Sequence, residues 1–279
     1  MFLKATYIEL FKLFRKGRSY IGIMAVIIII VLIEVGLISG GQALLDTLTN
    51  NLGDSFYLQG NLLNGYLVAY FALNTLWIHI PILIVIVTGD MVAGEYSAGT
   101  IRLVMTRPVT RAVFITSKFC AAMLYVSLLV IILGIVSLGL GIMLFGKGDL
   151  IVLLNGISII PETELPARFF MAFLYGLISM WMVGALAFFF SCISENSLTP
   201  VLASMAIVIL FTILSNFEVA FFDPLKPFLF TTYIGKWRSF FEFTPSTSGI
   251  YNSGIILILH ILALYLLSII VFGKKDITT

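Results

Sequence analysis

Six long apolar runs dominate the chain and alternate with shorter polar stretches. The runs cover residues 20–39, 66–89, 119–145, 169–192, 198–217 and 250–272. A helix needs about 20 apolar residues to cross a hydrocarbon layer of about 30 Å. The pattern therefore predicts an all-α membrane protein with about six transmembrane helices, and no polar block is long enough for a soluble domain. We expect a single transmembrane domain over residues 1–279.

Composition supports this interpretation. Of the 279 residues, 60% are hydrophobic and 11% are charged, and the mean hydropathy is +1.11. Soluble proteins contain about 45–50% apolar and about 25% charged residues. The expected surroundings are membrane lipid, with no nucleic acid. Cys120 and Cys192 lie in or beside apolar runs, which favours buried free thiols over a disulfide.

The first apolar run resembles a signal peptide only superficially. It is too long for the apolar region of a typical signal peptide, and no A-x-A-like cleavage site follows it. We expect it to remain as the first span.

Residues 2–16 have the pattern of an amphipathic helix. On a helical wheel one arc is polar (Lys4, Glu9, Lys12, Arg15, Lys16) and the opposite arc is apolar (Leu3, Tyr7, Leu10, Phe11, Phe14). Such a helix lies in the membrane interface with its lysines towards anionic headgroups. Two roles fit this pattern equally, a simple anchor and a lever beside a cytoplasmic partner.

Orientation follows from the distribution of basic residues. With six spans, both chain ends lie on the same side as the loops after the second and fourth spans. That side carries eleven basic residues, which are Lys4, Lys12, Arg15, Lys16, Arg18, Arg102, Arg107, Arg111, Lys118, Lys274 and Lys275. The other side carries five, which are Lys147, Arg168, Lys226, Lys236 and Arg238. Because cytoplasmic loops are enriched in Lys and Arg, we expect a multi-pass protein of the plasma or inner membrane with both termini in the cytoplasm.

The loop after the second span is the most informative segment. Residues 94–111 read G-E-Y-S-A-G-T-I-R-L-V-M-T-R-P-V-T-R, which predicts a short helix that Pro108 ends. An amphipathic helix at the cytoplasmic face can dock in a groove of a soluble protein. The residues alone favour an ordinary interfacial loop whose arginines follow the positive-inside rule.

This loop resembles the signature of ABC-type export permeases of the second, six-span class. The matching residues, in order, are Glu95, Gly99, Thr100, Ile101, Arg102, Pro108 and Arg111. The layout of an amphipathic start, six spans and a charged tail is also similar. The resemblance implies that residues 94–108 form a coupling loop, with Glu95, Gly99, Thr100, Arg102, Arg107 and Pro108 in the region that meets an ATPase.

The resemblance also implies the partners. A separate ABC ATPase subunit would bind ATP and Mg²⁺, and a second copy or a paralogue of the permease would complete the transporter. Residues 38–42 (I-S-G-G-Q) and 141–148 imitate ATPase motifs. The second lacks the Ser or Thr that binds Mg²⁺ in a P-loop. We therefore expect no enzyme activity, catalytic residue, cofactor or metal site in this chain.

Three ionisable residues lie inside predicted spans, where such groups are costly and often functional. They are Glu34, His79 and His260. A proton relay or a substrate contact is one interpretation. The alternatives are snorkelling for Glu34 and neutral interhelical hydrogen bonds for the histidines.

The segment from 217 to 248 is rich in Phe, Trp and Tyr, and three prolines interrupt it. Aromatic residues gather at the membrane interface, so we expect short interfacial or re-entrant helices on the outer side. A stand-alone secondary transporter is the alternative to the exporter, although no internal repeat supports it. The residues do not indicate a substrate.

Overall fold

The computed structural model describes residues 2–50, 62–101, 103, 110–153 and 157–275. Within these residues, six helices are long and apolar enough to cross a membrane. They are α2 (Gly17–Asn50), α3 (Gly65–Thr88), α6 (Arg111–Phe145), α7 (Leu165–Ile193), α8 (Leu198–Asn216) and α10 (Thr247–Lys274). The predicted number of spans is confirmed. Several helices extend beyond the predicted runs, and α6 begins eight residues before the expected start at 119 because its first two turns carry polar residues.

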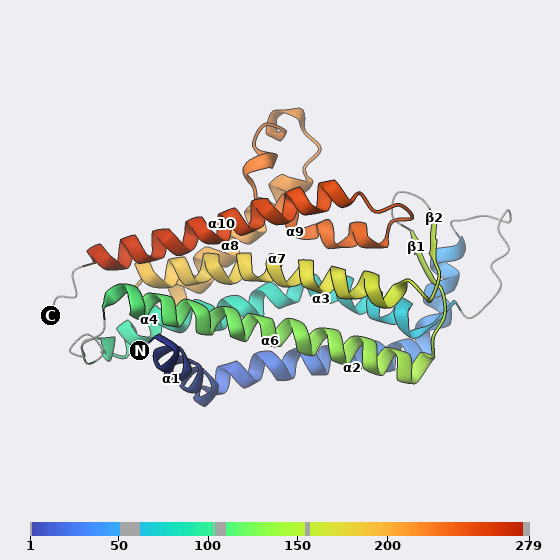
Figure 1. Ribbon diagram of the computed structural model, residues 1–279. Coiled ribbons are helices and arrows are strands. Elements are labelled where there is room, and N and C mark those ends of the chain that lie inside the picture. Colours follow the sequence, from blue (N-terminus) through green and yellow to red (C-terminus); the bar gives the residue numbers. More distant parts are fainter. Residues whose placement is uncertain (1, 51–61, 102, 104–109, 154–156, 276–279) are drawn as a thin grey trace.

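The six helices run side by side along one axis (Figure 1). One end of the bundle carries α1 (Phe2–Arg15), α4 (Asp90–Ser97) and the C-terminal end of α10. We call this the terminal end. The opposite, hairpin end carries β1 (Leu150–Leu153) and β2 (Ile157–Ile160).

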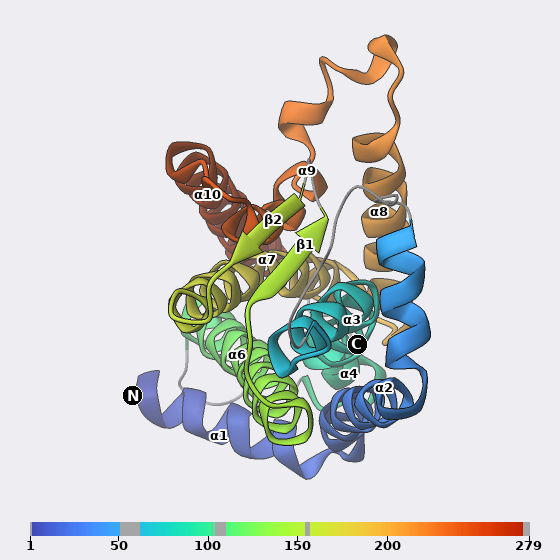
Figure 2. The same ribbon diagram turned by 90° about the vertical axis from the view of Figure 1, so that its right-hand side faces the viewer.

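Helices α3, α6 and α7 form the centre of the bundle. They contact one another, and α2, α8 and α10 pack around them (Figure 2). Small residues permit the close approach: a methyl group at Gly184 of α7 would lie 3.2 Å from side chains of Met123 and Val126 on α6. The outer helices are much less covered, and only Pro200 and Ser204 are buried in α8.

The two-stranded hairpin was not predicted. It is antiparallel and pairs Leu150 with Ile160 and Val152 with Ser158. Its sequence signal was Asn155-Gly156 between two apolar, β-branched runs, which is a strong hairpin pattern. The runs were too short to compete with the spans in a search for long apolar helices.

The segment between α8 and α10 consists of short helices, as its prolines indicated. They are η1 (Ala220–Phe222), η2 (Lys226–Phe228), α9 (Thr231–Ile234) and η3 (Gly235–Phe241). Helix η3 buries Trp237 and Phe241 in the bundle, where their rings lie 6.1 and 5.1 Å from the ring of Tyr70.

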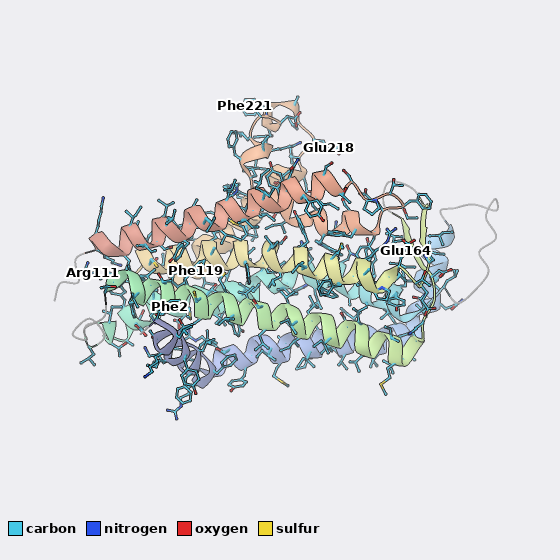
Figure 3. The ribbon with its side chains drawn as sticks, in the orientation of Figure 1. Phe2, Arg111, Phe119, Glu164, Glu218 and Phe221 are labelled. Carbon is cyan, nitrogen blue, oxygen red and sulfur yellow. The ribbon has the colours of Figure 1, made fainter. Side chains whose placement is uncertain are left out.

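Residues 217–228 form an arm that stands out from the side of the bundle (Figures 1 and 3). On the arm, Phe221 and Phe228 are 78% and 75% exposed.

Candidate functional site

Helix α1 lies across the terminal end, and Thr6, Glu9 and Leu13 face the bundle. Glu9 and Leu13 are buried, whereas Leu3 and Tyr7 are 79% and 70% exposed. Exposed apolar residues of this kind suit a membrane interface. Glu9 and Lys12 differ from the expectation, because their side chains contact charged groups of the protein and not lipid headgroups. The reason is that oppositely charged side chains from two other helices meet them there.

Four charged side chains from α1, α4 and α6 form one network, which we call the four-charge network. Lys118 Nζ lies 2.6 Å from Glu9 Oε2 and 2.8 Å from Glu95 Oε1. Lys12 Nζ lies 2.7 Å from Glu9 Oε1 and 3.2 Å from Glu95 Oε1. The side chain of Lys118 is only 2% exposed. Because two ammonium groups balance two carboxylates, no net charge is buried, which is the condition for placing such groups inside a protein.

The network changes the protonation behaviour of its α1 members. Burial by itself raises the pKa of Glu9, but the charges and hydrogen bonds of Lys118 and Lys12 outweigh burial and bring this pKa below its ordinary value. Burial lowers the pKa of Lys12, and the hydrogen bonds and charges of Glu9 and Glu95 raise it above its ordinary value. Both groups are therefore held in their charged forms.

Asp90, in the first turn of α4, forms a second charged contact. Its Oδ2 lies 2.8 Å from Lys16 Nζ and its Oδ1 lies 2.8 Å from Arg18 Nη1. Gly94 leaves room for the Asp90 carboxylate, because a methyl group there would lie 2.5 Å from Asp90 Oδ1. The start of α2 is thus connected to α4.

Helix α4 ends in a glycine cap that explains part of the signature. Gly99 has φ +66°, its N–H donates to the carbonyl of Tyr96, and the N–H of Thr100 donates to the carbonyl of Glu95. These two bonds define a Schellman motif, which requires a left-handed residue at the glycine position. The Glu-x-x-x-Gly-Thr spacing therefore has a structural role at the end of a helix.

The cap corrects the predicted extent of the coupling helix. Glu95 belongs to α4, which continues from the second span and ends at Ser97, so the predicted short helix is interrupted at Gly99 and does not continue from Glu95 to Pro108 as one element. Gly99 turns the chain before the next residues, of which Ile101 is buried and Leu103 is exposed. Arg102, Arg107 and Pro108 lie outside the described residues.

Hydrogen bonds also connect α4 to the end of α7 and to the turn between α7 and α8. Ser191 Oγ accepts hydrogen bonds from the amides of Val92 and Ala93, at 3.0 and 2.9 Å. Ser97 Oγ donates to the carbonyl of Glu195 at 3.1 Å and accepts from the amide of Ser197 at 3.2 Å. The start and the end of α4 are both held in this way.

The end of α10 completes the cluster. Lys275 Nζ lies 4.1 Å from the centre of the Tyr96 ring and donates to the carbonyl of Ile193 at 2.8 Å. Arg111 Nη1 donates to the carbonyls of Gly273 and Lys275, both at 2.9 Å, and so binds the C-terminal end of α10. Arg111, the last residue of the signature, thus joins α6 to α10.

Sequence reasoning missed the partners in this site. In the sequence, Asp90 indicated only where the second span ends. Lys118 was only one of the eleven basic residues expected on the cytoplasmic side. Their positions beside long apolar runs were the available signal, since a charge at such a place needs a partner.

The three intramembrane candidates are not brought together. They lie on α2, α3 and α10. His79 is exposed on the outside of α3, and its Nδ1 lies 2.8 Å from the carbonyl of Thr75. His260 Nδ1 lies 2.8 Å from the carbonyl of Ile256. These contacts are within single helices, so the expected interhelical bonds are absent among the described residues.

Glu34 differs from the expected snorkelling side chain. It is fully buried on the side of α2 that faces the bundle, and neither carboxylate oxygen has a hydrogen-bond partner among the described residues. It follows Val26 and Ile30 in the same buried stripe, which directs it inwards. Across the described residues, no group of three or more His, Cys, Asp or Glu side chains is placed to hold a metal ion.

The six apolar helices define this chain as a multi-pass helical membrane protein. It belongs to the family described as "Protein of unknown function (DUF2705)", whose model matches residues 27–278. The chain is 30% identical over 199 residues to "Uncharacterized protein YhcI" of Bacillus subtilis (strain 168). That match covers 69% of this chain and 63% of the relative's length. Neither description assigns an activity.

Proposed function

We propose that this protein is the membrane-spanning permease subunit of an ABC transporter, and that it works as an exporter in the cell membrane. A separate ATPase subunit binds ATP and Mg²⁺ and hydrolyses the nucleotide. The terminal end faces the cytoplasm in this proposal, in line with the eleven basic residues predicted on that side.

One observation carries the proposal: α4 is connected to nearly every span at the terminal end. The four-charge network joins it to α1 and α6, Asp90 joins it to the start of α2, and Ser191 joins it to α7. Lys275 stacks on Tyr96 and adds α10. A loop with these connections moves as one body with the spans, which is what transmission of force from a docked ATPase requires.

The contacts also divide the predicted coupling residues by role. The Glu95 side chain is 12% exposed and bound to two lysines, so we assign it a positioning role within the permease. Gly99 and Thr100 turn the chain at the end of α4. The direct contact with the ATPase falls to Arg102 and Arg107, which follow this turn.

The test is co-purification of the tagged chain in mild detergent from its native membranes. We expect a soluble P-loop ATPase to co-purify and to hydrolyse ATP. The Arg102→Ala/Arg107→Ala variant should lose this partner. The control, Lys147→Ala/Lys236→Ala, removes two exposed basic residues outside the loop and should keep it. The proposal fails if the wild type purifies without an ATPase.

A second copy or a paralogue of the chain completes the transporter in this proposal, and the arm supports such a partner. The arm leaves the bundle midway along its length (Figure 1) and carries Glu218, Asp223 and Lys226. The arm directly follows α8, so it lies at the membrane interface when α8 crosses the membrane. The exposed rings of Phe221 and Phe228 can pack against a second copy there, since aromatic residues are enriched in protein interfaces.

Glu34 supports the alternative, a secondary transporter that works alone. A buried carboxyl group without a partner in a span is a typical proton or cation site. Reconstitution of the chain alone in vesicles separates the two functions. Solute movement driven by a proton gradient and abolished by Glu34→Gln would replace the exporter by a secondary transporter.

A further inference from the structure

A cavity of about 540 Å³ opens at the terminal end, between α1, the first turn of α2, α4 and the start of α6. Part of its wall is apolar and includes Ile8, Leu13, Leu103 and Phe114. Ile8 is 45% exposed and lies on α1 near Leu3 and Tyr7, which form the outward apolar side of that helix. The cavity therefore adjoins the surface that we assign to the membrane interface.

The charges of the cavity wall do not balance. Five basic residues line it (Lys12, Arg15, Lys16, Arg18, Lys118) and three acidic residues oppose them (Glu9, Asp90, Glu95), which leaves an excess of two positive charges. The four-charge network is neutral within itself. The excess thus falls on three residues, because Lys16 and Arg18 share the single carboxylate of Asp90 and Arg15 forms no ion pair with a described residue.

These three residues are accessible. The side chains of Lys16 and Arg18 are 43% and 44% exposed. Arg15 is exposed, and its guanidinium carbon lies 4.8 Å from the centre of the Phe11 ring. Two guanidinium groups and one ammonium group in the lining of one cavity suit a phosphate, since Arg binds phosphate oxygens in a bidentate manner.

We propose that this cavity binds the headgroup of an anionic phospholipid. Arg15, Lys16 and Arg18 hold the phosphate, while Ile8 and Leu103 contact the glycerol and the first acyl carbons. Basic pockets at the cytoplasmic side of membrane proteins bind such headgroups. The apolar wall beside the exposed side of α1 favours a lipid over a free phosphate ion. The site goes beyond the proposed function and does not depend on an ATPase.

Lipid binding in this cavity acts on α4. A phosphate at the rim competes with Asp90 for Lys16 and Arg18, the two residues that connect the start of α2 to α4. The headgroup therefore changes how firmly α4 is held, so that the lipid composition of the membrane regulates the proposed coupling loop.

The test is the binding of short-chain phosphatidylglycerol to the purified full-length chain in detergent, followed by the shift of the thermal unfolding midpoint. Parallel titrations use short-chain phosphatidylcholine, glycerol 3-phosphate and inorganic phosphate. We expect a saturable shift with phosphatidylglycerol alone. For Arg15→Gln/Lys16→Gln/Arg18→Gln, we expect an apparent affinity about 100-fold weaker, from the usual contribution of each basic residue at an anionic lipid surface.

Two variants make the test specific. Lys4→Gln removes an exposed basic residue of α1 that does not line the cavity, and it should bind phosphatidylglycerol like the wild type. The Arg15→Gln/Lys16→Gln/Arg18→Gln variant leaves the Asp90 carboxylate without its two partners. The variant Lys16→Gln/Arg18→Gln/Asp90→Asn therefore removes this carboxylate together with the two basic groups that bind it. Native mass spectrometry counts the phosphatidylglycerol molecules retained by each variant, independently of the unfolding midpoint.

Three outcomes would overturn the proposal. Equal shifts of the unfolding midpoint with phosphatidylcholine would mean that the cavity does not distinguish an anionic headgroup from a zwitterionic one. Equal saturation by inorganic phosphate would identify a site for free phosphate. Equal losses of affinity in Lys4→Gln and in Arg15→Gln/Lys16→Gln/Arg18→Gln would reduce the effect to general attraction between a basic surface and an anionic lipid. None of these results bears on co-purification of an ATPase, so failure here is distinguishable from failure of the proposed function.

Discussion

At the scale of single residues, Lys118 connects α1, α4 and α6 at the terminal end. It is nearly inaccessible, yet it contacts carboxylates from two other helices. A buried charge of this kind adds modest net stability while it is paired, but its removal leaves its partners buried and uncompensated. The pairing makes the position sensitive to change because two acidic residues depend on it.

We therefore predict that Lys118→Met lowers the free energy of unfolding by about 3–5 kcal/mol, the usual effect of breaking a buried ion pair. Denaturant unfolding in detergent measures this effect. The control is Lys147→Met, since Lys147 is 59% exposed and its Nζ lies 3.9 Å from Glu162; here we expect a change within about 0.5 kcal/mol. Equal losses in both variants would contradict the assigned role of Lys118. Glu95→Gln in the Lys118→Met background should restore part of the stability.

At the scale of elements, periodicity predicted the six spans and the amphipathic helix of residues 2–16. It could not predict which side of α1 faces the protein, because Glu9 finds its partner Lys118 across 109 positions of the sequence. The same limit applies to α4. The signature indicated its importance, whereas the turn at Gly99 is decided by a backbone conformation that composition does not reveal.

Docking of α1 should depend on pH at both extremes. The pKa of Glu9 lies below its ordinary value of 4.5, so undocked α1 binds more protons, and docking weakens as the pH falls through the lowered pKa. The pKa of Lys12 lies above its ordinary value of 10.5, so docking also weakens as the pH rises through the raised pKa. Between these limits α1 stays docked.

The mobility of a spin label at Ala5→Cys reports this behaviour. We expect an immobile label over the middle of the pH range and a mobile one in strong acid. In a Glu9→Gln background the acid transition should disappear, because the group that titrates is gone. A transition in acid that persists unchanged in this background would mean that another group releases α1.

At the scale of the whole molecule, the arm and the thinly covered outer helices distinguish this chain from a self-contained bundle. The aromatic and proline content of 217–248 predicted short helices but not their division, in which η3 is buried and the arm projects. That division depends on the contact of the Trp237 and Phe241 rings with Tyr70 on α3. Local sequence patterns do not predict this contact, because it joins distant parts of the chain.

We predict that the arm contributes to pairing with a second copy. Phe221→Ser/Phe228→Ser should lower the dimer fraction by about tenfold or more, since each buried Phe side chain typically contributes about 1.5–3 kcal/mol. Light scattering of the purified protein in detergent measures this fraction. The control is Met143→Ser, a residue of α6 that is 81% exposed and lies off the arm. A dimer that survives loss of both phenylalanines would exclude the arm from the interface.

The four-charge network also sets an order of events during synthesis. Glu9 leaves the ribosome 109 residues before Lys118, which at about 5–20 residues per second is an interval of roughly 5–20 s. Throughout that interval Glu9 can pair with Lys12 of its own helix but not with Lys118, which connects α1 to the bundle. The amphipathic helix must therefore wait at the membrane surface until the third span arrives, and a chain truncated before residue 118 leaves it permanently undocked.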